Sequence, residues 1–101
     1  MSSPFRMKIY RQGKELLVAA SDEHLIGRKL SEGKLRLEVK EAFYGTEQGT
    51  EALLLQYLKI CTIANLVGAV VVGLAVREGF IDIEAVILID GVPHAQLARM
   101  V

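Results

Sequence analysis

Apolar and polar residues alternate along the first part of the chain. The alternation from Phe5 to Arg11 has the period of a β-strand, and a second strand-like run follows from Glu15 to Ala20. Gly13 lies between the two runs and can adopt the positive φ of a tight turn. The pattern therefore predicts a β-hairpin. Its first strand would turn Phe5, Met7 and Ile9 to one face and Arg6, Lys8 and Tyr10 to the other.

Two further elements are predicted before the middle of the chain. Ser21 and Asp22 are suited to cap one or two helical turns, which Gly27 would end. After a turn at residues 31–33, the alternation over residues 35–40 predicts a third strand with one solvated face. This strand could lie beside the first hairpin.

A pair of helices is predicted next. Thr50 is suited to cap a helix that runs to Ile60, after a loop at residues 44–49. The pattern from Ile63 to Glu78 also favours a helix, but one that is apolar on all sides and must be covered. Small residues would form a stripe on it, where a sheet or another helix could approach closely: Ala64, Gly68, Ala75 and Gly79.

The apolar segment also raises the question of a membrane span. Residues 60–76 carry no charge over 17 residues, at the lower end of the roughly 17–25 that a spanning helix needs. Asn65 interrupts the segment, and strand-like runs that need an apolar partner lie on both sides of it. We therefore predict a buried core helix and no membrane association.

The end of the chain predicts a second hairpin. Ala85 to Ile89 is a continuous apolar run typical of a central strand, and Asp90-Gly91 favours a type I′ turn. Pro93 lacks an amide donor, so we expect the strand over residues 95–101 either to lie at a sheet edge or to begin after Pro93. Together these elements predict an α+β fold, a single domain over residues 1–101 with a mixed or antiparallel sheet packed on the helical pair.

Composition supports a globular domain and refines its charge. Half of the chain is hydrophobic (51%), and 12 Lys and Arg balance 12 Asp and Glu. Residues 1–40 hold nine basic and five acidic residues, whereas residues 41–101 hold three and seven. Neutrality of the whole chain therefore does not exclude an anionic partner of the first part. A single cysteine, Cys61, and the lack of a signal-peptide pattern predict a cytoplasmic protein.

Four segments carry a family resemblance: KIYRQGKELLVAASDEHLIGRKLSEGKLRLEV, FYG, TIANLVG and GVPHAQL. Through them the chain resembles the archaeal Domain of Unknown Function 424 family from about Met7 to Met100. The resemblance implies a small archaeal intracellular protein, and it implies no reaction and no catalytic residue. Family members carry more charge after TIANLVG, whereas Ala69 and Gly73 keep this helix apolar. This difference favours a homodimer through the helix at 63–78.

Metal and nucleophile chemistry have little basis in the sequence. Cys61, His24 and His94 lack the paired spacing of a zinc site, so we predict no metal and no cofactor. Cys61 and His94 could form a thiol–imidazole pair oriented by Asp90. A cysteine in an apolar stretch is more often buried and inert, however, and we name no catalytic residue.

The GVPHAQ segment is a candidate ligand site. Gly91 and Pro93 would fix a turn, after which His94 and Gln96 project from one face of a strand. A histidine can bind phosphate or carboxylate, or act as an acid or base; the alternative is that His94 bonds a loop carbonyl and holds the turn. Asn65 joins these residues as a tentative contact, although a capping or backbone-bonding role is the simpler one.

The basic first part of the chain offers a second surface, formed by Arg6, Lys8, Tyr10, Arg36 and Lys40. Cations with an aromatic residue on an open sheet face are typical of single-stranded RNA binding. A solvated face is the simpler explanation, however, and no RNP, KH or dsRBD motif is present. The sequence therefore favours a non-enzymatic binding module for RNA, a ribonucleoprotein or a protein. The alternative is a small-ligand or catalytic site around GVPHAQ.

Overall fold

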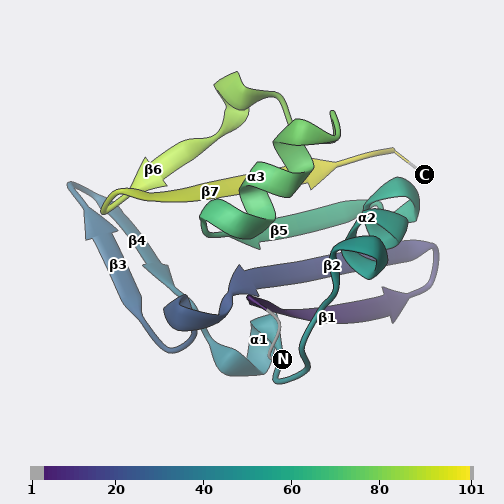
Figure 1. Cartoon of the computed structure of the whole chain (residues 1–101), viewed down its shortest axis with the longest axis horizontal. Coiled ribbons are helices and arrows are strands. Elements are labelled where there is room, and N and C mark those ends of the chain that lie inside the picture. Colours follow the sequence, from purple (N-terminus) through teal and green to yellow (C-terminus); the bar gives the residue numbers. More distant parts are fainter. Residues whose placement is uncertain (1–3, 101) are drawn as a thin grey trace.

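A five-stranded mixed sheet with strand order β1-β2-β5-β7-β6 forms the centre of the molecule (Figure 1). The computed structural model describes residues 4–100. Strands β2 and β5 are parallel, and the other neighbours are antiparallel. The predicted α+β class and the first hairpin are confirmed. The strands are β1 (Phe5–Gln12), β2 (Glu15–Asp22), β5 (Ile63–Val67), β6 (Ile87–Ile89) and β7 (Val92–Ala98).

Two helices cover one face of this sheet, α2 (Glu51–Ile60) and α3 (Ala69–Arg77) (Figure 1). The Thr50 hydroxyl accepts a hydrogen bond from the Leu53 amide, so the predicted cap is confirmed. The core on this side includes the apolar face of β1, as the alternation predicted. Its buried members include Phe5, Met7, Val18, Leu54, Leu58, Ala64 and Leu66.

Three small elements cover the opposite face: a 3₁₀ turn (Glu23–Leu25), a hairpin of β3 (Lys29–Glu32) and β4 (Leu35–Glu38), and the one-turn helix α1 (Glu41–Tyr44). β3 and α1 were not predicted from the sequence. The strand predicted over residues 35–40 is β4, and it pairs with β3 instead of lying beside the first hairpin. These elements pack a second core from Leu25, Leu30, Val39 and Tyr44 against Ala19 and Val67. Both faces of the central sheet are therefore covered in part.

The predicted helix over 63–78 is wrong in its first third. Residues 63–67 form β5 between β2 and β7, and Gly68, at φ 114°, separates this strand from α3. A strand that is buried on both faces lacks polar alternation, so its pattern cannot be told from that of a buried helix. The proposed stripe of small residues therefore does not lie on one helix. No helix within residues 4–100 is long and apolar enough to span a bilayer.

The C-terminal hairpin has its strands in the reverse of the predicted places. The turn is confirmed, since Asp90 and Gly91 both have positive φ (55° and 76°). However, β6 is the edge strand and β7 is interior, paired with β5 through residues 94–98. Pro93 precedes that paired stretch, and its carbonyl still accepts from the Gly68 amide at 2.8 Å. An amide at position 93 would have faced Gly68, just past the end of β5, and the Gly68 carbonyl accepts from the Val72 amide at 3.0 Å instead. Val101, at the end of the predicted strand, lies outside the described residues.

Asp22 caps a different helix from the predicted one. Its side chain makes no capping bond to the 3₁₀ turn that follows it. Instead, the carboxylate accepts hydrogen bonds from the backbone amides of Val70 (3.0 Å) and Val71 (3.1 Å), in the first turn of α3. A carboxylate is favourable at the positive end of a helix dipole. The parallel pairing of β2 with β5 brings the end of β2 to this position.

Candidate functional site

One face of the sheet carries both sets of candidate residues. Lys8 lies opposite Ala19, Ala19 opposite Asn65, and Asn65 opposite Gln96, in a row across four strands. Side chains that lie opposite one another project to the same face. Helix α1 contacts β1 and β2 on this side and divides the face in two. Lys8 lies on one side of α1, and Asn65 and Gln96 lie on the other.

A pocket of about 390 Å³ opens between the β3–β4 hairpin, α1 and the strands β5 and β7. Its position follows from the second core, which holds the hairpin and α1 over the sheet and leaves the polar end of the row uncovered. We call it the His94 pocket. Its lining consists of Leu37, Glu38, Lys40, Phe43, Tyr44, Asn65, His94 and Gln96.

The floor of the pocket holds a pair of side-chain amides. Gln96 Nε2 donates to Asn65 Oδ1 at 2.7 Å across the β5–β7 pairing. Asn65 thus has a partner, as the sequence analysis required, but on a strand rather than in a helix. The bond uses one donor and one acceptor, so further donor and acceptor groups of the pair stay open to the pocket.

His94 lies beside the amide pair, with a ring nitrogen that is buried and unpaired. Its Nδ1 atom has no hydrogen-bond partner in the described part of the chain. The alternative role, in which His94 bonds a loop carbonyl, is therefore not fulfilled at this nitrogen. Burial lowers the pKa of His94 below its usual 6.5, so the ring is neutral at pH 7 and has one donor and one acceptor nitrogen.

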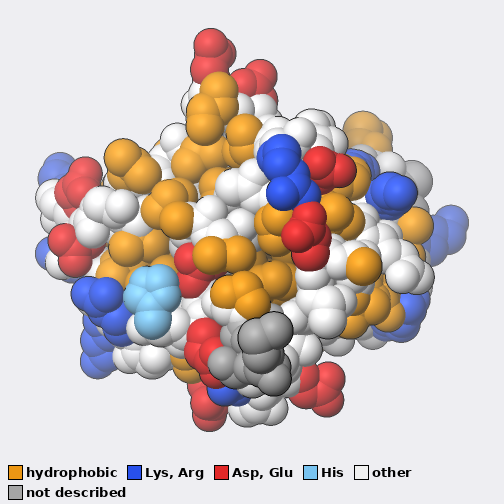
Figure 2. Space-filling model, viewed as in Figure 1, with side chains coloured by type: hydrophobic (Ala, Val, Ile, Leu, Met, Phe, Trp, Pro, Cys, Tyr) orange, Lys and Arg blue, Asp and Glu red, His pale blue; other side chains and the backbone are white. Residues whose placement is uncertain are grey.

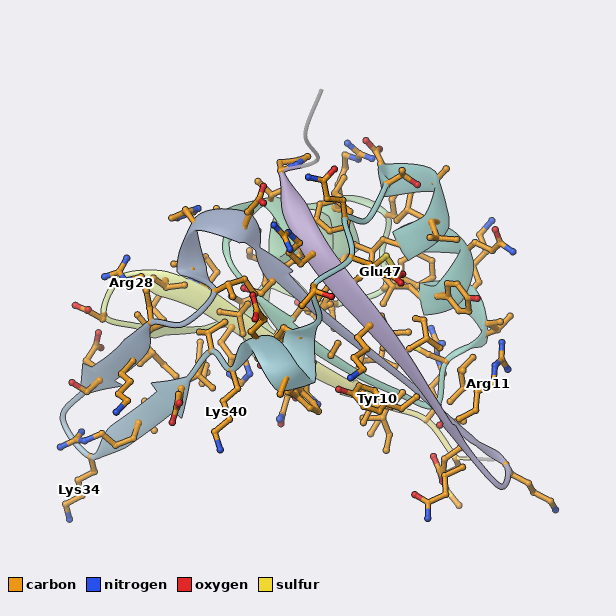
Figure 3. The ribbon with its side chains drawn as sticks, turned by 90° about the horizontal axis from the view of Figure 1, so that it is seen from below. Tyr10, Arg11, Arg28, Lys34, Lys40 and Glu47 are labelled. Atoms are coloured by element: carbon orange, nitrogen blue, oxygen red, sulfur yellow. The ribbon has the colours of Figure 1, made fainter. Side chains whose placement is uncertain are left out.

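Lys40 and Glu38 bring charge to the hairpin side of the pocket. Both residues are exposed, and neither side chain makes a hydrogen bond or ion pair with another described residue. Lys40 occupies the N-cap position of α1, between β4 and the aromatic residues. In Figure 3 its side chain points to the same side of the molecule as that of Lys34. The ammonium group is therefore available to a ligand.

Tyr44 and Phe43 form the aromatic wall of the pocket. Their rings meet edge to face with centroids 4.9 Å apart, and Phe43 also stacks on Tyr10 at 5.6 Å. Burial raises the pKa of Tyr44 to about 12, so this phenol stays protonated at neutral pH. The wall is held in place by its own contacts.

The N-terminal part of the predicted nucleic-acid surface is engaged within the protein. Arg6 pairs with Glu23 at 2.5 Å, Lys8 donates to the Ala42 carbonyl at 3.1 Å, and Tyr10 donates to the Phe43 carbonyl at 2.6 Å. These bonds hold the 3₁₀ turn and α1 on the sheet. The three side chains project to the predicted face, but the structure gives each of them a structural partner there.

Arg36 lies on β4, away from the His94 pocket. Its guanidinium donates to the carbonyls of Gly33 (2.7 Å) and Leu35 (2.9 Å), within its own hairpin. Of the five predicted nucleic-acid contacts, only Lys40 joins the pocket.

A group of exposed cations next to the pocket was not predicted from the sequence. Arg28, Lys29, Lys34 and Lys40 have no side-chain bond to any residue of the described range, and we call residues 28–40 the basic arm. Lys and Arg side chains mark the arm at the left edge of the molecule (Figure 2). Their common location was hidden because β3 was not predicted.

The remaining candidates lie outside the pocket. Gly91 forms the exposed turn, and Pro93 is half-buried between β5 and β6. Cys61 belongs to the core under the helices, on the other side of the sheet from His94, and burial raises the pKa of its thiol. The thiol–imidazole pair is therefore not formed. Residues 4–100 hold no group of three or more His, Cys, Asp or Glu that could bind a metal ion.

Comparison with known proteins gives a family. A family model described as a protein of unknown function (DUF424) matches residues 10–100. The chain belongs to this family. The DUF424 fold is also that of an uncharacterized conserved protein from Methanopyrus kandleri, which aligns with a TM-score of 0.76 and 21% identity over 96% of this chain and 95% of the other. No curated protein matches significantly. The predicted DUF424 resemblance is confirmed, and it assigns no activity.

Proposed function

We propose that this protein is a binding module for a small anionic ligand, a phosphate or carboxylate compound, in the His94 pocket. One observation carries the proposal: Lys40, Asn65, His94 and Gln96 come from three separate segments and converge on one pocket. Such convergence of a few polar groups on an aromatic-lined depression is typical of ligand sites. The proposal develops the alternative that the sequence placed at GVPHAQ.

The charged lining residues are one cation, Lys40, and one anion, Glu38, so an anion would be held by Lys40 together with the neutral donors of the pocket. Lys40 is the cation of the lining, and it has no ion-pair partner in the described structure. The neutral imidazole and the two amides can donate to a ligand's oxygen atoms. Glu38 lies on the same rim and would repel the anionic group of a ligand, so we place that group at the Lys40 ammonium group.

Binding rather than catalysis is supported by what surrounds the imidazole. Within residues 4–100, no carboxylate is bonded to the buried Nδ1 of His94, and the thiol of Cys61 lies in the other core. A general base in a catalytic pair needs a nucleophile within hydrogen-bond reach. The expected cytoplasmic location remains part of this proposal.

The test is an NMR titration of the full chain with inorganic phosphate and with succinate at low salt. We expect saturable shifts at Asn65, His94 and Gln96, and their loss in Lys40→Gln. The matched control is Lys34→Gln, which removes an equally exposed cation of the arm that does not line the pocket. Shifts of equal size in both variants, or no shifts for either anion, would refute the proposal.

Single-stranded RNA is a second candidate ligand, and the basic arm favours it. The arm holds five basic residues (Arg28, Lys29, Lys34, Arg36 and Lys40) against Glu32 and Glu38. Glu32 is partly engaged, since it accepts from the Asp90 amide at 2.8 Å. Free cations on an exposed hairpin can contact phosphates without base specificity. We propose no protein partner and no homodimer. The homodimer was predicted to cover an apolar helix over residues 63–78, but these residues form the strand β5 and the shorter helix α3.

A gel-shift series with labelled single-stranded RNA at increasing salt tests this second function. We expect affinity to fall with salt and to be lost in Lys29→Glu combined with Lys34→Glu. The control pair is Arg11→Glu with Lys14→Glu, which makes the same charge change on exposed residues of the β1–β2 hairpin. Equal losses in the two pairs would show a net-charge effect and no site on the arm.

A further inference from the structure

We infer that the ligand of the His94 pocket is a nucleotide, an aromatic heterocycle that carries a phosphate. This inference rests on the proposed function, because it names the class of anion that the same pocket takes. It is drawn from three features of the pocket. The amide pair suits the edge of a base, the aromatic wall suits its ring, and Lys40 suits the phosphate.

The amide pair provides a donor and an acceptor side by side. With Gln96 Nε2 bonded to Asn65 Oδ1, the Gln96 carbonyl oxygen and the Asn65 amide nitrogen face no other described partner. If both amides were turned over, one donor and one acceptor would still be free. The edges of nucleobases present neighbouring donors and acceptors, which Asn and Gln side chains read by paired hydrogen bonds. Inorganic phosphate cannot use such a pair as well.

The aromatic wall gives the ring of a base a fixed surface. Phe43 is half-buried, with its ring stacked on Tyr10 (interplanar angle 22°) and in edge contact with Tyr44 (87°). The Tyr10 hydroxyl in addition holds the Phe43 carbonyl at 2.6 Å. An aromatic ring that is already ordered loses little freedom when a base contacts it. A sugar phosphate has no base that could contact this wall, so the wall would not add to its affinity.

The charged end of the ligand has a place on the arm side. Lys40 lines the pocket opposite the strands that carry the amides, so a base at the amides would leave its phosphate near the ammonium group. The pocket has a volume of about 390 Å³ and is open to solvent, so part of a bound nucleotide would stay exposed. Further cations, Lys34 among them, extend from the same arm.

Calorimetry with nucleoside monophosphates and with ribose 5-phosphate tests the inference on the full chain. We expect at least one of AMP, GMP, CMP and UMP to bind about tenfold more tightly than ribose 5-phosphate, since a good bidentate amide contact is worth that much or more. Gln96→Leu should lower the affinity for the nucleotide more than the affinity for ribose 5-phosphate, and so remove this advantage. Lys40→Gln should weaken all five compounds.

The outcomes separate this inference from the proposed function. If ribose 5-phosphate binds as tightly as every nucleotide, the pocket takes phosphates and the nucleotide inference is wrong. If no compound binds, the nucleotide inference fails, and the titration with inorganic phosphate and succinate decides the proposed function separately. Gln96 is exposed, so its replacement should leave the fold intact, and an unchanged melting temperature confirms this. A loss that is equal for the nucleotide and the sugar phosphate in Gln96→Leu would also overturn the inference.

Discussion

The carboxylate of Asp22 binds the backbone amide of Val71 across 49 positions of the sequence. Asp22 is 1% exposed, and its second oxygen accepts from Val70. The N-terminus of α3 would otherwise attract an anion, because its amides are unpaired there and its dipole is positive. In this protein the Asp22 carboxylate occupies that position, and an external anion is excluded from it. The anion site that we propose is a different one, on the other face of the sheet.

Replacement of Asp22 should destabilise the protein. Asp22→Ala leaves two amides of α3 without their acceptor, and we expect a loss of about 1–3 kcal/mol in the free energy of unfolding. Asp22→Asn keeps one acceptor oxygen and should lose less. Urea denaturation measures both, with Glu84→Ala, an exposed substitution, as the control. Equal stability of Asp22→Ala and the parent chain would contradict the capping role.

Gly68 and Gly73 should respond in opposite directions to the same change. A Cβ on Gly68 would lie 2.3 Å from Asp22 Cγ, and the residue has φ 114°, so we expect Gly68→Ala to destabilise by more than about 2 kcal/mol. Gly73 lies inside α3 with open space around it, and Gly73→Ala should stabilise by about 0.5–1 kcal/mol. Thermal melts of both variants check this. A neutral Gly68→Ala would refute the close approach to Asp22.

Tyr10→Phe should loosen α1. The change removes the hydrogen bond to the Phe43 carbonyl but keeps the ring stacking, so we expect a loss of about 0.5–1.5 kcal/mol. Tyr57→Phe is the matched control, because no hydrogen bond of the Tyr57 hydroxyl occurs among the described residues. Chemical denaturation of the two variants should separate them, and equal stabilities would show that the Tyr10 hydroxyl does not hold α1.

Acid should destabilise the protein in part through His94. Burial lowers the pKa of His94 in the folded state below 6.5, whereas the unfolded chain keeps the ordinary value. As the pH falls through 6.5, the unfolded state takes up this proton first, so the free energy of unfolding decreases until the pH passes the folded pKa. His94→Gln should remove this part of the decrease between pH 7.5 and 5. His24→Gln, at an exposed position, is the control and should leave this decrease in the free energy of unfolding unchanged. Identical pH dependence in the parent chain and His94→Gln would contradict this role.

The sequence was informative wherever side-chain period and local turn chemistry decide the structure. Alternation identified β1 and its buried face, and Thr50 and Asp90-Gly91 marked a helix start and a turn that the structure contains. These features depend on residues within a few positions of each other. They could therefore be predicted without knowledge of the tertiary fold.

The errors concern features that depend on contacts between distant segments. Four of the five residues of β5 are apolar because the strand lies inside the sheet and both of its faces are largely covered. Asn65 is its one polar residue, and this removes the alternation that would have identified a strand. Pro93 was expected at an edge, but its place before the stretch paired with β5 makes an interior strand possible. Asp22 was predicted to cap the turn that directly follows it. Its actual partners lie in α3, far along the chain, where the sequence gives no local signal of them.

The candidate site was half visible in the sequence. His94 and Gln96 could be grouped by their spacing on one strand, and Asn65 was noted as a polar residue that needed a partner. That Lys40 joins them follows from the packing of β4 and α1 over the sheet, for which the sequence held no local signal. Arg6 and Lys8 looked free for the same reason, since their carbonyl and carboxylate partners come from residues 23–46.

The β3–β4 hairpin has a consequence for motion and ligand linkage. It forms its own two-stranded sheet, so it can separate from the molecule without breaking any ladder of the central five strands. Its hydrogen-bonded amides should therefore exchange with solvent before those of β2 and β5. A ligand held between Lys40, which follows this hairpin at the start of α1, and Gln96 on β7 would oppose the opening. Slower exchange of the β3 and β4 amides would then report its binding.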